Sequence, residues 1–593
     1  MLRESMSKAS VGADEAAAEQ VEDSHEDQPL RNLSDDSTLD DVEDFALQYG
    51  FEDELEILQK AASLLRKDSD EDTIPGITPA ELEALHGEST HKWRQPWMLY
   101  FTIFVCSLGA IEQGWAQTGM NGANLYLPKA MDIDSDSTYD SFILGLLNCG
   151  LYLANACWGS WMSEPVNRHL GRRGAVAVAN GFCLIGNLGS GISGTWPVLL
   201  LFRLVLGTGL GLNASTVSIL AAESAPPYIR GGLATSWQMF TAFGILVGFL
   251  ANVAFYNLGP DVIWRYQLAA PLVPTIPLLL FVYLCPESPA WHFKREHYRE
   301  GYASLIKLRN TEMQAAREMY ATHLAMKSDV NLRVPALQTF TSKLRSLFTV
   351  PRNRHAMYAS YTVMLAQQIC GINIIAFYSS TIFSSSDFSA FAALWASVVF
   401  GFINFVGAFP AIWTMDTFGR RRLLLWTLPI MAVTMALAGL SFTLPRGTAQ
   451  FIFLAGLIYL FCALYSPGMG PVPVAYSAEV YPLHVREVGM SFAISTASTW
   501  ATILSLTFPA LLNGIGEIIT FELYAVLNVL AWCLCWTFVR EVKGVRLDEM
   551  DAVFESSAAA FAGEMWDDSL WSKRGRRKLG KGWVEVGQAD ANE

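Results

Sequence analysis

The sequence predicts an all-α membrane protein with twelve transmembrane helices arranged as two six-helix pseudo-repeats. Three observations lead to this fold class. Of the 593 residues, 52% are hydrophobic and only 16% are charged. The apolar residues gather in runs of about twenty, each long enough to cross a bilayer. Charged motifs also recur six apolar runs apart, which indicates two related halves.

The first 95 residues are hydrophilic and rich in acids, most densely in SDDSTLDDVEDF. A segment of this composition buries little apolar surface, so residues 1–95 are predicted to be a disordered acidic cytosolic tail. An amphipathic helix within 39–65 is expected to rest loosely on the bundle rather than to form a domain. The acids of the tail also account for the formal charge of −15, so no basic partner is required and no nucleic acid is expected as a partner.

Twelve apolar segments follow in two groups of six. Residues 96–286 are predicted to form the N-terminal half and residues 356–540 the C-terminal half. A charged block at 287–355 is predicted to be a cytosolic helical linker, and residues 541–593 a cytosolic C-tail. The expected spans are 97–119, 142–162, 174–194, 198–222, 233–256, 266–285, 357–383, 391–414, 423–443, 451–475, 489–512 and 521–539.

The short loops differ in charge in a way that predicts the orientation. Arg168, Arg172 and Arg173 follow the second span, and residues 420–422 after the eighth span are also arginines. The loop after the first span instead carries four aspartates between residues 132 and 140. Because basic short loops stay in the cytosol, both termini are predicted to be cytosolic. The plasma membrane is the expected location.

Acid and base motifs recur at matching positions in the two halves. Glu223 and Arg230 after the fourth span match Glu479 and Arg486 after the tenth at identical spacing. Topology alone would explain the arginines but not the repeated acids. We therefore predict cytosolic ion-pair networks that lock one conformation and break in another. Their predicted members are Glu164, Arg168, Arg172, Arg173, Glu223, Arg230, Glu287, Asp416, Arg420, Arg421, Glu479 and Arg486.

The seventh span is unusually polar for a helix that crosses a membrane. It reads AQQICGINIIAFYSS and contains Gln367, Gln368 and Asn373. An unpartnered amide in hydrocarbon costs roughly 2–7 kcal/mol, so these groups are expected to face a wet cavity or a protein interior. Carboxamides donate and accept, as hydroxyl groups do, which favours a polyol ligand. The alternative is that they hold neighbouring helices together.

Seven motifs occur in order between about residues 96 and 550. They read EPVNRHLGRR (164–173), FRLVLGTGLG (202–211), ESAPPYIRG (223–231), PESP (286–289), QQICGIN (367–373), DTFGRR (416–421) and GPVPVAYSAEVYPLHVR (470–486). Together they resemble the sugar porter branch of the major facilitator superfamily, and their wording is similar to that of a fungal subgroup. The resemblance implies hexose contacts at Gln238, Gln367, Gln368, Asn373 and Asn404.

Two departures from the family pattern affect the expected mechanism. Proton-coupled members carry an aspartate in the first span that faces an arginine of the fourth. Here the arginine is Arg203, but the aspartate position reads Ala116. Glu112, one turn earlier, is the acid that could replace it. If Glu112 faces another helix instead, the resemblance implies a facilitator, and proton coupling is doubtful.

The second departure concerns the expected cavity wall in the C-terminal half. Val474 stands where the family often has an aromatic residue, and the polar and aromatic positions of the eleventh span read Ala497, Ser498 and Ala501. This part of the site is therefore expected to be less polar than a hexose site. A larger or more apolar solute would suit it.

The sequence therefore predicts a secondary transporter that moves a sugar, a polyol or a similar hydroxylated solute by alternating access. A transporter or exporter of a specialised metabolite is one alternative, and a non-transporting nutrient sensor is another. Protons remain an open second partner beside the solute and the lipid bilayer. We expect no enzyme, cofactor or metal site, because the nine cysteines lie in or beside apolar runs without metal-binding spacing.

Overall fold

The computed structural model describes residues 35–65, 77–133 with short gaps before residue 93, 137–226, 229–331, 339–384, 389–445, 447–482, 485–543, 550–554 and 561. Within these residues the chain forms helices and no β-strand. It divides into two compact units. The first comprises Met1–Tyr100, Glu223–Ile229 and Pro286–Leu337, and the second comprises Phe101–Ala222, Arg230–Cys285 and Gln338–Glu593.

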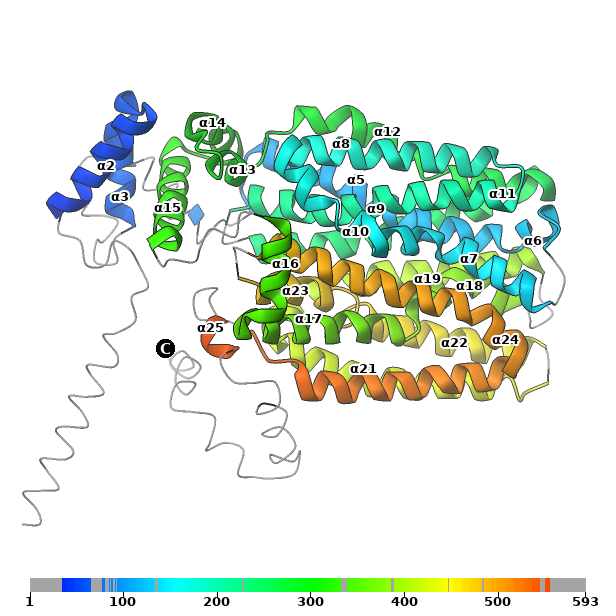
Figure 1. Cartoon of the computed structure of the whole chain (residues 1–593). Coiled ribbons are helices and arrows are strands. Elements are labelled where there is room, and N and C mark those ends of the chain that lie inside the picture. Colours follow the sequence, from blue (N-terminus) through cyan, green and yellow to red (C-terminus); the bar gives the residue numbers. More distant parts are fainter. Residues whose placement is uncertain are drawn as a thin grey trace, which may run out of the picture. The chain divides into compact units, whose positions relative to one another are not determined.

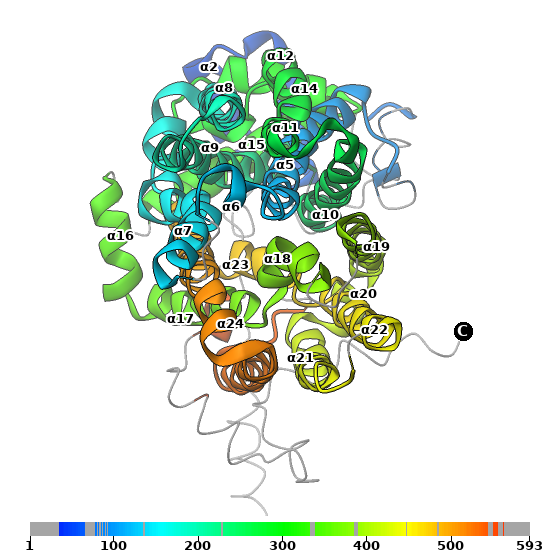
Figure 2. The ribbon, with the colours of Figure 1, turned by 90° about the vertical axis from the view of Figure 1, so that its right-hand side faces the viewer.

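The second unit is a helical bundle with two halves, which Figure 2 shows along the helix axes. Its first half carries the helices up to the linker. They are α5 (Trp97–Ala123), α6 (Leu127–Ala130), α7 (Thr138–Ala154) with the π-helical turn η3 (Asn155–Gly159), α8 (Ser163–Ile192), α9 (Trp196–Ser224), α10 (Arg230–Ala254), α11 (Pro260–Ala269) and α12 (Leu272–Phe281).

The second half of the bundle, from α16 onward, lies opposite (Figure 2). Its helices are α16 (Phe340–Thr349), α17 (Pro351–Ile369), α18 (Ile372–Ser384), α19 (Ala390–Ala408), α20 (Ala411–Phe418), α21 (Arg420–Ser441), α22 (Thr448–Tyr465), α23 (Val472–Val480), α24 (Arg486–Phe538) and α25 (Met550–Val553). The halves meet chiefly where α7 packs on α24 and where α10 packs on α19.

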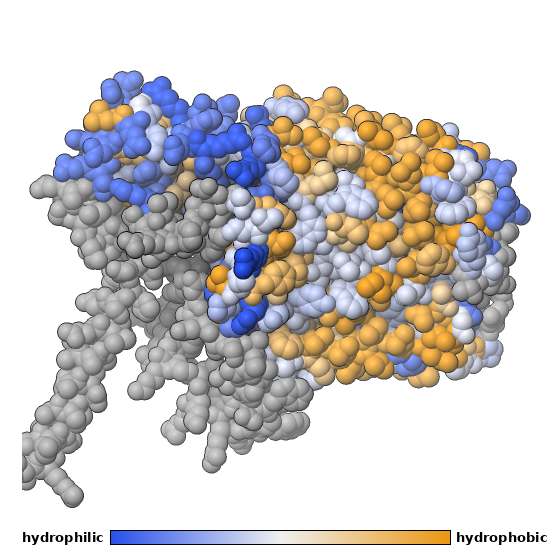
Figure 3. Space-filling view, viewed as in Figure 1, coloured by the Kyte–Doolittle hydropathy of each residue, from blue (hydrophilic) through white to orange (hydrophobic). Residues whose placement is uncertain are grey.

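The bundle has the length and polarity of a membrane domain. Among the described residues, ten helices are long and apolar enough to cross a bilayer. The last of them, α24, is broken at Gly516 (φ 83°), and α5 adds a further helix of 27 residues, in line with the twelve predicted spans. The side chains that cover these helices are mostly hydrophobic (Figure 3), and several large ones, such as Leu201, Trp426 and Val526, are exposed. A lipid-facing surface explains this exposure.

Two of the spans are interrupted near the middle of the bundle. Between α17 and α18 the chain turns at Gly371, whose φ of +95° favours glycine. The carbonyl group of Cys370, released by this break, accepts a hydrogen bond from Asn528 Nδ2 at 2.9 Å. Between α22 and α23 the chain turns through residues 466–471. Such breaks are tolerated in a membrane where the freed backbone groups are buried in protein or line a cavity.

The first unit contains α2 (Asp35–Tyr49), the short helix η1 (Glu52–Glu54), α3 (Leu55–Leu64), α13 (Pro289–Phe293), α14 (Tyr298–Leu308) and α15 (Glu312–Asn331) (Figure 1). These helices share one core of aromatic and aliphatic side chains. Phe45 is 3% exposed, and its ring packs edge-on against Tyr298 and Tyr320, with centroids 5.3 and 5.7 Å apart.

This unit corrects two expectations from the sequence. The prediction that residues 1–95 are disordered is wrong for Asp35–Leu64, which forms two helices. The expectation of a loosely attached helix is also wrong, since Phe45, Phe51 and Leu58 are almost fully buried in a core shared with the predicted linker. The acidic composition concealed a helical face with enough apolar surface to pack. Residues 1–34 lie outside the described part of the chain.

Candidate functional site

A cavity lies in the bundle between the two halves. Its empty volume is about 960 Å³, with the open solvent at its mouth included. Among the described residues that line it, none is charged, and eight are carboxamides. These are Gln113, Gln117, Asn155, Gln238, Gln367, Gln368, Asn373 and Asn404. All five predicted substrate residues are therefore brought together, and three carboxamides are additional.

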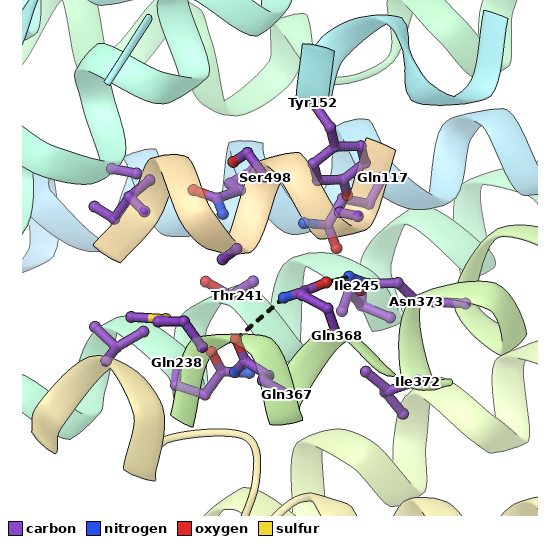
Figure 4. A pocket seen from close by; sticks show the side chains of 18 of the residues that line it. Gln117, Tyr152, Gln238, Thr241, Ile245, Gln367, Gln368, Ile372, Asn373 and Ser498 are labelled. Atoms are coloured by element: carbon purple, nitrogen blue, oxygen red, sulfur yellow. Dashed lines mark hydrogen bonds between the residues drawn. The ribbon is translucent and has the colours of Figure 1, made fainter. Parts of the chain in front are cut away.

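The carboxamides of the second half are engaged with one another and with the backbone. Gln367 donates from Nε2 to the carbonyl oxygens of Met469 and Gly470, at 3.1 and 3.0 Å, in the break between α22 and α23. Gln368 Nε2 donates to Gln367 Oε1 at 3.3 Å, and Asn373 Nδ2 donates to Gln368 Oε1 (Figure 4).

Asn404 of α19 accepts a bond from Ser466 Oγ at 2.9 Å. We call Gln367, Gln368, Asn373 and Asn404 the paired wall. Its hydrogen bonds fix the orientation of each amide before a ligand arrives. Gln367 thus joins two interrupted spans and also lines the cavity.

The carboxamides of the first half have a different environment. Gln113, Gln117 and Gln238 make no hydrogen bond to any described residue, and Asn155 only accepts one, at Oδ1, from Ser160. We call Gln113, Gln117 and Asn155 the free wall, whereas Gln238 Nε2 lies next to Gly470, beside the paired wall. Figure 4 shows Gln117 and Tyr152 on the opposite side of the cavity from Gln367. The amide groups of the free wall can therefore form hydrogen bonds to water or to a ligand.

The sequence analysis missed all three members of the free wall, Gln113, Gln117 and Asn155. The first two had a visible signal, because they are four residues apart and so share one face of a helix. Asn155 had none, since its position depends on the π-helical turn at the end of α7.

The apolar side of the cavity agrees with the sequence prediction. Val474, Ala497, Ser498 and Ala501 all line it, together with Ile494. Aromatic side chains stand elsewhere on the lining, as Tyr152, Trp237, Phe400 and Tyr465. A solute in this cavity would thus meet amides on two sides and small apolar groups on a third.

Glu112 and Arg203, the predicted coupling pair, do not contact each other. Glu112 is fully buried and accepts bonds from Thr275 Oγ1 of α12 at 2.6 Å and from Asn187 Nδ2 of α8 at 3.3 Å. Its carboxyl group points between helices of the first half and does not line the cavity. Arg203 of α9, 2% exposed, donates from Nε to the carbonyl oxygen of Leu147 at 3.0 Å and lies near Tyr152 and Tyr378.

A group of asparagines joins the two halves beside Ala376, which lines the cavity. Asn121 Nδ2 donates to Ala376 O and to Ser379 Oγ, at 2.9 and 3.0 Å. Asn124 Nδ2 donates to Phe377 O at 3.1 Å and exchanges bonds with Asn148, also at 3.1 Å. We call Asn121, Asn124 and Asn148 the asparagine clasp. It joins α5 and α7 of the first half to α18 of the second, and all three side chains are at least 90% buried.

Charged residues join the halves at the opposite end of the bundle, which we call the basic end after Arg172 and Arg420. Arg172 Nη2 pairs with Glu487 Oε1 of α24 at 2.7 Å, and Lys343 of α16 pairs with Glu164 at 3.3 Å. Arg173 Nη1 donates to the carbonyl oxygen of Cys285 at 2.9 Å, and Arg168 is exposed. Glu487 and Lys343 were not predicted as members of this network.

In the second half, Arg420 Nη2 pairs with Glu479 Oε1 at 2.9 Å. Glu541 accepts a bond from the backbone N–H of Arg420 at 3.0 Å and was not predicted either. Arg421 Nη2 donates to Trp536 O at 2.9 Å, and Arg486 Nε to Tyr481 O at 3.4 Å. Each of these contacts lies within the second half.

Two further predicted network residues, Glu223 and Glu287, belong to the first unit. In the first unit, Glu223 accepts a hydrogen bond from Ser288 Oγ, and Glu287 Oε1 accepts one from Ser288 N at 2.9 Å. The side chains of Arg230 and Asp416 lie outside the described part of the structure.

Two helical halves around a central cavity, with polar contacts that join them at either end, define a membrane transporter. The chain belongs to the sugar (and other) transporter family, whose model matches residues 102–554.

Its relatives cover most of the chain. It is 28% identical to putative polyol transporter 1 of Arabidopsis thaliana over 82% of this chain and 95% of that protein. It is 27% identical to the myo-inositol transporter FST1 of Gibberella moniliformis over 79% and 80%, and 27% identical to the galactose-proton symporter of Escherichia coli over 77% and 94%. These relatives confirm the resemblance that the motifs indicated.

The fold is that of the xylose transporter XylE from E. coli in a partially occluded inward-open conformation. The TM-score is 0.64 at 22% sequence identity, covering 76% of this chain and 99% of XylE. The major facilitator fold predicted from the sequence is thereby confirmed.

Proposed function

We propose that this protein is a facilitator that moves a neutral sugar or polyol across a membrane by alternating access. The observation that carries the proposal is the uncharged cavity with eight carboxamides from both halves. Each carboxamide donates and accepts hydrogen bonds, as each hydroxyl group of a polyol does. An ionic substrate would leave its charge without a counter-charge among the described lining residues, which is costly in a low-dielectric interior.

The names of the relatives support this substrate class. They include polyol, myo-inositol and galactose transporters. Sugars and polyols share closely spaced hydroxyl groups, which suit the carboxamides of the cavity. They are all uncharged and similar in size, so they differ from one another mainly in how their hydroxyl groups are arranged. Selection within the class therefore depends on the placement of the amides.

Alternating access needs two sets of contacts that are made and broken in turn. The asparagine clasp and the Arg172–Glu487 pair are suited to these roles, because each joins the two halves at one end of the cavity. We assign the basic end to the cytosol from its arginines. Both termini would then be cytosolic, and the plasma membrane is the proposed location.

The environment of Glu112 favours facilitation over proton symport. Symport requires a carboxyl group that binds a proton in one state and meets a base or the cavity in another. Glu112 is instead enclosed by Thr275 and Asn187, and Arg203 is bonded to the backbone of α7. With Ala116 at the position where the family's symporters carry an acid, no carboxyl group faces Arg203 in the described structure.

The test is uptake of sugars and polyols into vesicles with and without an imposed proton gradient. We expect wild-type flux to follow the solute gradient alone and to be the same in Glu112→Gln. The variant Ala116→Asp, which restores an acid near Arg203, is the positive control for gained coupling. Concentrative uptake by the wild type that is lost in Glu112→Gln would contradict facilitation.

A transporter of a specialised metabolite is the second candidate. The apolar side formed by Val474, Ile494, Ala497 and Ala501 favours it. A solute with hydroxyl groups and one apolar substituent would contact all three sides. The same vesicles, given simple polyols and aryl or alkyl glycosides, separate the candidates by which class competes better.

A further inference from the structure

Four carboxamides follow one another along α5. They are Gln113, Gln117, Asn121 and Asn124, at intervals of four, four and three residues. These intervals place all four side chains on one face of the helix. Asn121 and Asn124 bond to α18, so this face is turned towards the second half of the bundle.

The first two members of this row, Gln113 and Gln117, differ from the last two, Asn121 and Asn124, in their hydrogen-bond partners. Asn121 and Asn124 are occupied in the clasp, whereas Gln117, 9% exposed, makes no hydrogen bond to a described residue. Gln113 makes none either, and its Oε1 atom is buried without a partner. Both line the cavity. Burying an amide without a partner is unfavourable, and hydrogen bonds to a hydroxylated ligand would remove this cost.

Asn155 of α7 lies on the same side of the cavity. Its Oδ1 atom accepts a bond from Ser160, which fixes the plane of the amide, while Nδ2 makes no bond to a described residue. The π-helical turn at residues 155–159 sets this side chain at the cavity. Such turns occur often at functional sites.

We infer that Gln113, Gln117 and Asn155 form a second set of substrate contacts, which selects solutes that carry hydroxyl groups on two opposite edges. The inference rests on the proposed function, because it assumes a hydroxylated solute in the cavity. The paired wall binds one edge through Gln368 and Asn373, and the free wall binds the other. Cyclitols and open-chain polyols have hydroxyl groups all round and satisfy both walls.

A solute that lacks hydroxyl groups on one edge would leave the free wall unpaired. A site built to bond a hydroxyl group rejects the analogue without it strongly, because its own polar groups then stay buried and unsatisfied. The free wall would therefore discriminate between myo-inositol or sorbitol and their deoxy analogues, in addition to fixing affinity.

The experiment measures binding and transport in proteoliposomes with the full chain. The probes are myo-inositol, D-sorbitol and D-glucose, each with its set of monodeoxy analogues. The variants are Gln113→Leu and Gln117→Leu for the free wall and Gln368→Leu for the paired wall. Asn180→Leu of α8 is the matched control, since Asn180 is also a buried carboxamide within a span but bonds its own helix at Val176 O and lies outside the cavity lining.

We expect Gln117→Leu to weaken binding of the preferred polyol about tenfold, which corresponds to about 1.4 kcal/mol. For one deoxy analogue the same substitution should change the affinity less than twofold, because the bond is already absent. That analogue identifies the hydroxyl group that Gln117 contacts. Gln368→Leu should likewise leave the affinity for one analogue nearly unchanged, but this should be a different analogue, lacking the hydroxyl group that Gln368 contacts. Asn180→Leu should leave all affinities within about twofold of the wild-type values.

Two negative results have separate meanings. If Gln368→Leu abolishes binding while Gln113→Leu and Gln117→Leu keep wild-type affinity and selectivity, the second set of contacts is refuted and the proposed function stands. If the wild type binds and transports no sugar or polyol of the panel, the proposed function itself is refuted. A loss in Asn180→Leu equal to that in Gln117→Leu would also overturn the inference, by showing a general effect on the bundle.

Discussion

The two walls of the cavity carry the same chemical group in different states. In the paired wall, Gln367, Gln368 and Asn373 form a continuous chain of hydrogen bonds that ends on the backbone of the interrupted tenth span. In the free wall, Gln113 and Gln117 have no partner among the described residues. The paired wall is held in place by its own hydrogen bonds, whereas under the proposed function the free wall would gain its order from the solute.

The difference shows how a transporter combines selectivity with release. A fixed wall loses little conformational entropy on binding, so its contacts define which hydroxyl pattern is accepted. A wall with unpaired amides contributes most to the binding free energy when the solute fills the closed cavity. It contributes less when the halves move apart. Because the two walls belong to different halves, closing the cavity around a solute would bring both into contact with it.

The largest expected effect is on the paired wall. Gln368→Leu removes a ligand contact and also leaves Gln367 Oε1 and Asn373 Nδ2 without their partner. We expect a loss of affinity of about 100-fold, or about 3 kcal/mol, against about tenfold for Gln117→Leu. Equilibrium binding of the preferred polyol to both variants measures the difference. Equal losses in the two would show that pairing within the wall adds nothing.

The fold and half of the site follow from the sequence because they depend on local patterns. The apolar runs and repeated motifs predicted the bundle, and the amides of the seventh span were visible as polar residues in an apolar run. The asparagine clasp and the pairs of Arg172 with Glu487 and of Glu164 with Lys343 were not predicted, because they join residues far apart in the chain.

In the first unit, the sequence predicted too little structure. Its acidic composition predicted disorder for residues that form α2 and α3, because the average charge conceals Phe45, Phe51 and Leu58. These side chains are stable only in a core shared with α14 and α15, which lie more than 200 residues later in the sequence. The composition of a segment does not indicate whether a distant part of the chain packs against it.

The second prediction concerns the stability that the paired wall contributes. Gln367→Leu leaves the carbonyl groups of Met469 and Gly470 without donors in a buried break of the helix. We expect the free energy of unfolding to fall by about 1–3 kcal/mol. Gln117→Leu should not lower it, because Gln117 has no bond to lose. Thermal unfolding of the ligand-free variants in detergent compares them, and equal midpoints would show that the walls do not differ in pairing.

The smallest expected effect is on the clasp, and it divides α5 into two functional parts. Asn124→Ala removes the bond to Phe377 O between the halves and the bonds to Asn148 within the first half, so it should shift the conformational equilibrium about tenfold towards a state open at the clasp end. Affinity for the solute should change little, since Asn124 does not line the cavity. Gln117→Leu, seven residues away on the same face, should weaken affinity and leave the equilibrium unchanged.

Spin labels report this shift directly. Lys129 and Ser389 are exposed and lie at the clasp end, one in each half, so cysteines placed there can be labelled after the exposed Cys157 has been changed to Ser. The ratio of the population with the longer distance between labels to that with the shorter distance should rise about tenfold in Asn124→Ala and stay at the wild-type value in Gln117→Leu. The opposite pattern, with Asn124→Ala lowering affinity at an unchanged distance distribution, would mean that the row of amides on α5 acts throughout as a binding surface. The paired and unpaired amides of α5 would then not differ in their effect on the conformational equilibrium.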